Sequence, residues 1–133
     1  QNVPGVAGLA AGVRLLQATG LEQVKEKKKA LTAAFLAGLE RIPGVAVYGT
    51  KNADTSAGVV SLNLEGLDNG TLSYILEESY GIMTRSGLHC APLAHKTIGT
   101  FPDGTLRFSF GLTNTGDDIA AILAALQEVA KKS

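Results

Sequence analysis

Cysteine and aromatic residues are scarce in this sequence, which holds one cysteine (Cys90), no tryptophan, three tyrosines and four phenylalanines. A single cysteine excludes an internal disulfide and is typical of a reducing compartment, so we expect a cytoplasmic protein. With so few aromatic rings, the hydrophobic core must be built mainly from Ala, Val, Leu and Ile. The residues that are missing therefore point to an intracellular protein with an aliphatic core.

Net charge and long apolar runs are also lacking. Twelve basic residues balance twelve acidic ones, so the composition does not indicate a nucleic acid or a membrane surface as partner. No apolar run approaches the roughly 18 uncharged residues of a membrane span. The first residue is not Met, and no signal-peptide pattern follows it. The sequence reads like the middle of a longer chain.

What is present is a folded, rather apolar chain, because 45% of its 133 residues are hydrophobic and that length suits one domain. Hydrophobic periodicity and turn residues predict helices over residues 3–19, 21–42, 69–80 and 116–132, with one or two helical turns between 93 and 99. They predict strands over residues 45–48, 58–64, 82–85 and 105–110. The expected fold is a two-layer α+β domain, with a small mixed or antiparallel sheet of three or four strands covered by helices.

The first predicted helix has one face almost without side chains, because Gly5, Gly8 and Gly12 follow one another at helical spacing. Each glycine inside a helix costs about 1 kcal/mol relative to Ala. Close packing against another element should compensate for that cost. We expect residues 1–19 to pack against a part of the protein outside residues 1–133.

The segment from Arg85 to Pro92 holds the lone Cys90 and one of the two histidines, His89. Gly87 allows a tight turn that could lift Cys90 out of the packed body. Arg85 and His89 would favour a thiolate if the fold turned them toward the sulfur. On spacing alone, however, a small buried apolar residue is the commoner fate of a free cysteine.

The residues from Arg85 to His95 (RSGLHCAPLAH), followed by GTFPDGTLRFS over residues 99–109, resemble the C-terminal part of the cysteine desulfurases. These are pyridoxal phosphate enzymes of the class V aminotransferase superfamily, and the likeness is to its selenocysteine lyase-like branch. It extends over nearly all of the chain. The opening residues from Asn2 to Gly8 look like the segment just after the family's phosphate-binding pair.

The resemblance implies that residues 1–133 are the C-terminal small domain of a fold-type I enzyme, with residues 1–19 against the missing large domain. Pyridoxal phosphate would be bound by that large domain, so none of its ligands is expected here, although Asn2 would lie near the phosphate-binding segment. Lys96 is predicted not to be the Schiff-base lysine, and the fragment alone is predicted to be inactive.

The resemblance also implies a role for each site residue. Cys90 would attack the sulfur of L-cysteine, leaving a Cys90 persulfide and L-alanine, and Arg107 would bind the substrate carboxylate. Arg85 and His89 would tune or orient Cys90. Residue 88 is Leu where the better-known bacterial enzymes commonly carry a second histidine, which leaves open both the sulfur acceptor and whether L-selenocysteine is the alternative substrate. The expected partner is a sulfur-acceptor protein, and the expected process is iron–sulfur cluster assembly. The expected assembly is a homodimer.

Three other interpretations remain open at this point. A class V aminotransferase or β-lyase would need no thiol in this loop, and a non-catalytic α+β binding module would carry the same fold without chemistry. A metal site built from His89, Cys90 and His95 is disfavoured, because adjacent His89 and Cys90 cannot easily chelate one ion with good geometry. We therefore expect no metal site and assign no role to His95.

Overall fold

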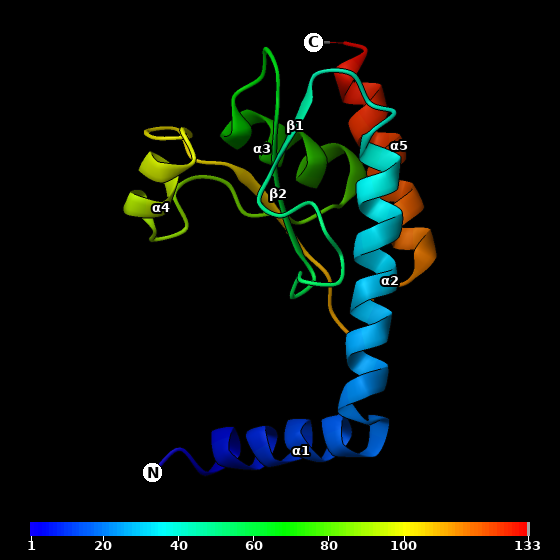
Figure 1. The fold of residues 1–133 in the computed structure, drawn as a ribbon. Coiled ribbons are helices and arrows are strands. Elements are labelled where there is room, and N and C mark those ends of the chain that lie inside the picture. Colours follow the sequence, from blue (N-terminus) through cyan, green and yellow to red (C-terminus); the bar gives the residue numbers. More distant parts are fainter. Residues whose placement is uncertain (133) are drawn as a thin grey trace.

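Three antiparallel strands with helices packed on one face form the body of the protein (Figure 1). The computed structural model describes residues 1–132. In chain order the elements are α1 (Val3–Thr19), α2 (Leu21–Leu39), β1 (Val45–Tyr48), β2 (Val59–Leu64), α3 (Asn69–Tyr80), α4 (Pro92–Thr97), β3 (Leu106–Ser109) and α5 (Gly116–Ala130). Among the described residues, no helix combines the length and hydropathy that crossing a bilayer requires. The predicted α+β class is confirmed.

The sheet has the order β1-β2-β3, and its two faces differ in chemistry. On one face Leu62 of β2 pairs with Leu106 of β3, and both side chains are fully buried. On the other face Ser61 pairs with Arg107. Because side chains alternate along a strand, the clean alternation predicted for residues 105–110 places the apolar side chains against the helices and Arg107 on the polar face.

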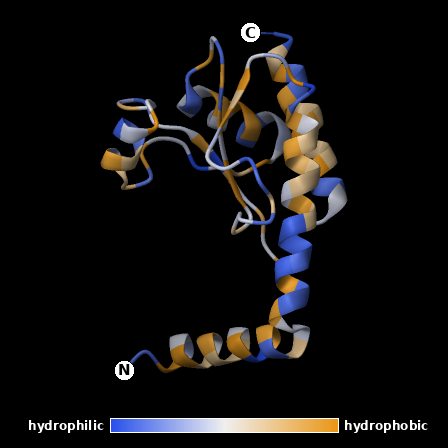
Figure 2. Cartoon of the chain, in the orientation of Figure 1, coloured by the Kyte–Doolittle hydropathy of each residue, from blue (hydrophilic) through white to orange (hydrophobic). Residues whose placement is uncertain are grey.

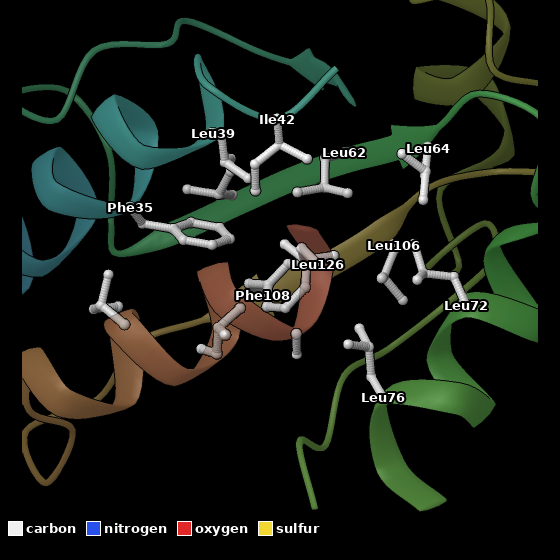
Figure 3. Close-up of a cluster of buried hydrophobic side chains, with 14 of the residues drawn as sticks. Phe35, Leu39, Ile42, Leu62, Leu64, Leu72, Leu76, Leu106, Phe108 and Leu126 are labelled. Atoms are coloured by element: carbon white, nitrogen blue, oxygen red, sulfur yellow. The ribbon is translucent and has the colours of Figure 1, made fainter. Parts of the chain in front are cut away.

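The hydrophobic core lies between the sheet and α2, α3 and α5 (Figure 3). Phe35 of α2 is at its centre, with its ring 5.0 Å from that of Phe108 and 5.2 Å from that of Phe110. These tilted and edge-on contacts are the favourable geometries for aromatic pairs. Leucines supply most of the remaining core, as the shortage of aromatic residues predicts. They are Leu31, Leu39, Leu62, Leu64, Leu72, Leu76, Leu106 and Leu126.

Helix α1 projects from the body and meets α2 at Gly20 (Figure 1). It has no buried residue, yet it is largely apolar (Figure 2). Val3, Val6 and Leu9 are 67–70% exposed, and nothing lies within 4 Å of a Cβ placed on Gly8 or Gly12. The predicted glycine face is therefore open in this chain.

Two of the predicted helix caps are present in the structure. Asp68 accepts a hydrogen bond from the Thr71 amide at 2.8 Å, and this bond holds the pKa of the Asp68 carboxyl below its usual value. Thr115 and Asp118 form a capping box at the start of α5, in which each side chain accepts from the other residue's backbone N–H. Both helices begin where the sequence predicts.

Two predicted elements are corrected. The predicted strand over residues 82–85 is wrong, because the Ile82 amide donates to the Leu76 carbonyl and closes α3, and only Arg85 pairs with β3. Helix α2 ends at Leu39 instead of residue 42. Pro43 explains this, since a residue before proline is pushed out of the helical region.

Candidate functional site

The segment that carries Cys90 begins as a short ribbon paired with β3. Arg85 and Arg107 exchange both backbone hydrogen bonds, at 3.2 and 2.8 Å. Two residues further on, the Gly87 and Thr105 backbones exchange another pair, both at 3.1 Å. The first half of the cysteine loop is therefore fixed to the sheet, beside Arg107.

Gly104 is what allows this ribbon to lie so close to the start of β3. A Cβ on Gly104 would overlap the backbone of Gly87, and its φ of +81° is itself unfavourable for other residues. Glycine is required here both for its conformation and for the close approach of two backbones.

Asn63, near the end of β2, also holds this region in place. Its side-chain amide donates to the Gly104 carbonyl at 3.1 Å and accepts from the Leu106 amide at 3.3 Å. Sequence analysis missed this residue. Asn is depleted in strands, so its presence inside a predicted strand was the available signal.

The chain then reverses in a tight turn whose two central residues are His89 and Cys90. The Ala91 amide donates to the Leu88 carbonyl at 2.8 Å, and φ is +51° at His89 and +59° at Cys90. Positive φ at both central positions defines a type I′ turn, which normally uses Gly or Asn. Cys90 is exposed at this turn, so the interpretation of Cys90 as a small buried residue is wrong.

The ring of His89 points back toward Arg85, which precedes the turn. Its Nε2 lies 3.0 Å from the Arg85 carbonyl oxygen. A carbonyl can only accept, so Nε2 carries the proton and donates it. In the neutral ring this leaves Nδ1 of His89 as a hydrogen-bond acceptor. The next residue in the sequence, Cys90, carries the thiol.

After the turn, α4 carries His95, which is buried at 5% exposure. Its Nδ1 lies 2.7 Å from the Thr100 hydroxyl, and its ring centroid is 5.7 Å from that of His89. Sequence analysis assigned no role to His95, because nothing in its spacing from Thr100 predicts the contact.

Arg85 and Arg107 make this surface electropositive. Directly opposed residues of an antiparallel pair place their side chains on the same face, so both guanidinium groups arise on the polar face of the sheet. Neither has an acidic partner among residues 1–132, and Nε of Arg107 is buried without a hydrogen-bond partner. Opposed like charges are unfavourable, and paired guanidinium donors suit a carboxylate.

The structure thus brings Arg85, His89 and Arg107 together through backbone pairing and one hydrogen bond, with Cys90 directly after His89 in the turn. This segment leads into α4, which extends from the sheet away from α2 (Figure 1). Asn2 is not part of this group. It caps α1 by accepting from the Gly5 amide at 3.0 Å, at the end of the chain that Figure 1 shows apart from α4.

Lys96 lies on α4, directly after the cysteine turn. Lys96, the lysine nearest Cys90 in sequence, is exposed and places its Nζ 4.9 Å from the Phe101 ring centroid. Within the part of the chain that the structure describes, no three His, Cys, Asp or Glu residues are grouped to hold a metal.

Comparison with known proteins assigns this domain to a class. The family model "Aminotransferase class-V" matches residues 1–122, and the chain belongs to that family. The "Probable cysteine desulfurase" of Pyrococcus abyssi is 33% identical over 130 residues, which are 98% of this chain and 31% of the relative. The protein of the same name in Halobacterium salinarum is 38% identical over 124 residues, which are 93% of this chain and 29% of the relative.

The fold agrees with this assignment. The apo structure of the cysteine desulfurase from Thermococcus onnurineus NA1 superposes with a TM-score of 0.92 at 35% identity, over 99% of this chain and 32% of the other. The chain thus spans about a third of the length of the relatives that it matches. The named relatives within the family are cysteine desulfurases.

Proposed function

We propose that this chain is the C-terminal domain of a pyridoxal phosphate-dependent cysteine desulfurase, in which Cys90 receives the sulfur of L-cysteine. The observation that carries the proposal is an exposed thiol on a turn that follows directly from the paired strand of Arg85 and Arg107. A thiol alone would fit many functions. A thiol on the segment that pairs two arginines without acidic partners in the described part of the chain fits an amino acid that must be both bound and attacked.

Each residue has one task in the proposed step. Arg107 binds the carboxylate of the substrate, since its planar donors suit a carboxylate better than an ammonium does. The Cys90 thiolate attacks the substrate sulfur, so that a sulfur–sulfur bond forms while the bond from that sulfur to the β-carbon breaks. The electron pair of the broken bond stays on the β-carbon, which takes up a proton. The products are a Cys90 persulfide and L-alanine.

Arg85 and His89 support this step without reacting. The backbone of Arg85 pairs with that of Arg107 and also accepts the hydrogen bond from His89. Fixing His89 in this way fixes the residue next to the nucleophile. Nδ1 of His89 is left as a hydrogen-bond acceptor in the neutral ring.

Pyridoxal phosphate, when bound, supplies the electron sink that makes the substrate's carbon–sulfur bond labile. Its ligands are proposed to lie outside these residues, with Asn2 near its phosphate and with Lys96 not the lysine that holds it. Residues 1–133 are then a small domain, and α1 packs by its glycine face against the large domain. The fragment alone is inactive on this proposal.

The wider setting follows from the same proposal. The active protein is a cytoplasmic homodimer, and the Cys90 persulfide is passed to a sulfur-acceptor protein, with iron–sulfur cluster assembly as the destination. L-selenocysteine is an alternative substrate. An aminotransferase or β-lyase is the competing function, and it would not load sulfur onto Cys90.

Peptide mass spectrometry of the full-length protein after incubation with L-cysteine tests the proposal. The peptide that contains Cys90 is expected to gain the mass of one sulfur atom and to lose it on reduction. A protein that converts L-cysteine while this peptide stays unmodified would be an aminotransferase or a β-lyase.

A further inference from the structure

We propose that His95 is a positioning residue, which together with Thr100 holds the turn at His89 and Cys90 in the conformation that presents the thiol. The inference rests on the proposed role of Cys90 as the sulfur nucleophile. It concerns the residues behind the turn, which the proposed reaction does not use.

The turn needs support from its surroundings. His89 and Cys90 both have positive φ, at +51° and +59°, and the left-handed region is unfavourable for residues with a Cβ. One backbone hydrogen bond closes the turn, from the Ala91 amide to the Leu88 carbonyl. Strained backbone persists only where neighbouring structure over-determines it.

His95 provides that support through its backbone. Its amide donates to the Ala91 carbonyl at 3.2 Å, directly after the turn. Its own carbonyl accepts from the Thr100 amide at 2.9 Å and the Phe101 amide at 3.2 Å. The end of the turn is thereby tied to the segment that leads into β3.

The side chain of His95 provides the second connection. The residue is buried at 5% exposure, while its neighbours Ala94 and Lys96 are exposed. The Thr100 hydroxyl fixes the ring at 2.7 Å from Nδ1. The same ring packs on that of His89, with centroids 5.7 Å apart and planes tilted by 44°.

A continuous series of contacts results, from Thr100 to His95, from His95 to His89, and from His89 to the Arg85 carbonyl. The ring of His89 is thus held by Arg85, which precedes it in the sequence, and by His95, which follows it. Because Cys90 directly follows His89, fixing this ring fixes the direction in which the thiol leaves the turn. Removing the Thr100 hydroxyl should make the turn more mobile without removing any group that contacts the substrate.

The test compares Thr100→Val, which keeps the shape but removes the hydroxyl, with Thr100→Ser, which keeps the hydroxyl. Thr97→Val is the matched control, because Thr97 lies three residues before Thr100, at the end of α4, and its hydroxyl donates to the Leu93 carbonyl at 3.0 Å. Amide hydrogen exchange over residues 88–95 and the kinetics of sulfide release are measured in the full-length protein.

Thr100→Val is expected to speed exchange of the Ala91 and His95 amides about fivefold, the factor that corresponds to the loss of one net hydrogen bond. It should lower kcat by a similar factor and leave KM for L-cysteine unchanged, since Arg107 is untouched. Thr100→Ser and Thr97→Val should behave as the wild type. His95→Asn, which offers an amide in place of Nδ1 but no ring against His89, should resemble Thr100→Val.

Three results would overturn the inference. The first is exchange and turnover unchanged in Thr100→Val. The second is faster exchange that extends equally through β2, which would mean general destabilisation. The third is a Thr100→Ser variant that fails to rescue. Failure of the proposed function is distinguishable: the wild type would then not release sulfide together with equimolar L-alanine, while the local exchange effect of Thr100→Val, which needs no activity, would still support the positioning role.

Discussion

Arg107 is the residue whose surroundings depart most from those of an ordinary surface charge. Its Nε is buried and has no hydrogen-bond partner, although the chain offers 12 acidic residues. A buried donor left without a partner costs about 1–3 kcal/mol. A carboxylate supplied by the substrate would accept a hydrogen bond from this donor. It would also reduce the repulsion between the positive charges of Arg107 and Arg85.

Arg107→Gln is expected to lower kcat/KM for L-cysteine by about 10- to 100-fold, the range that corresponds to one charged hydrogen bond. The loss should appear mainly in KM. Steady-state sulfide release measures it, and Ser109→Ala on the same strand and face is the control. A wild-type KM in Arg107→Gln would remove Arg107 from the binding site.

Gly104 offers a second prediction at the residue scale. Gly104→Ala should destabilise the protein by about 3 kcal/mol or more, because left-handed backbone strain adds to a steric overlap with Gly87. Gly99→Ala is the matched control, since Gly99 has a φ of +75° but open space around its Cβ position. It should cost only about 1 kcal/mol. Equal losses in denaturant unfolding would show that contact with Gly87 does not matter.

Individual residues differed in how well the sequence predicted them. A two-part motif in the sequence singles out Cys90, Arg85, His89 and Arg107 as predicted site residues, and the structure shows that Cys90 is exposed and that Arg85 pairs with Arg107. It does not single out His95, because the contact of His95 with Thr100 crosses a loop whose path periodicity does not specify.

At the scale of elements, the local signals were reliable wherever a cap or an alternating pattern defined them. Helices α3 and α5 begin at their predicted caps, and β3 shows the predicted alternation. The strand predicted over residues 82–85 is wrong. Its apolar residues suit a strand, but the Ile82 amide is bonded to the end of α3, Met83 is 83% exposed, and pairing begins only at Arg85.

Asp118 makes the start of α5 sensitive to acid. Its hydrogen bond from the Thr115 amide, and then that from the Asn114 side chain, hold its pKa below the usual 3.8. The carboxylate form is thus favoured in the folded state, and the resulting stability is present above the unfolded pKa and lost as pH falls through the lower folded pKa.

Asp118→Asn should therefore lower Tm at neutral pH, and the difference from wild type should shrink as pH falls from about 5 to about 3. Thermal unfolding followed by circular dichroism over this range measures it. Asp117→Asn, in the same helical turn but outside the capping box, is the control. A difference from wild type that stays constant with pH would contradict the assignment.

At the scale of the whole molecule, α1 is the part that does not fit an independent domain. It buries no residue, although it is apolar along its length (Figure 2). Contiguous exposed apolar surface of this kind usually marks an interface. The chain matches about a third of its relatives' length, which is why we propose that a large domain covers this helix.

Gly8→Leu in the full-length protein should lower stability by about 1–3 kcal/mol, because a side chain would be forced into a close helix contact. Ala7→Leu is the control, since Ala7 shares the face of Arg14 instead of the glycine face. Unfolding of both variants measures the difference. If Gly8→Leu were as stable as Ala7→Leu, the glycine face would be open in the complete protein too.

The central claim is that Cys90 is the sulfur nucleophile, and sulfide release from L-cysteine by the full-length protein tests it most directly. We predict that the wild type releases sulfide with equimolar L-alanine. Cys90→Ala should lose this activity while it keeps the visible absorbance of bound pyridoxal phosphate. Full turnover of L-cysteine by Cys90→Ala would contradict the account and would make the thiol a bystander in a lyase or aminotransferase.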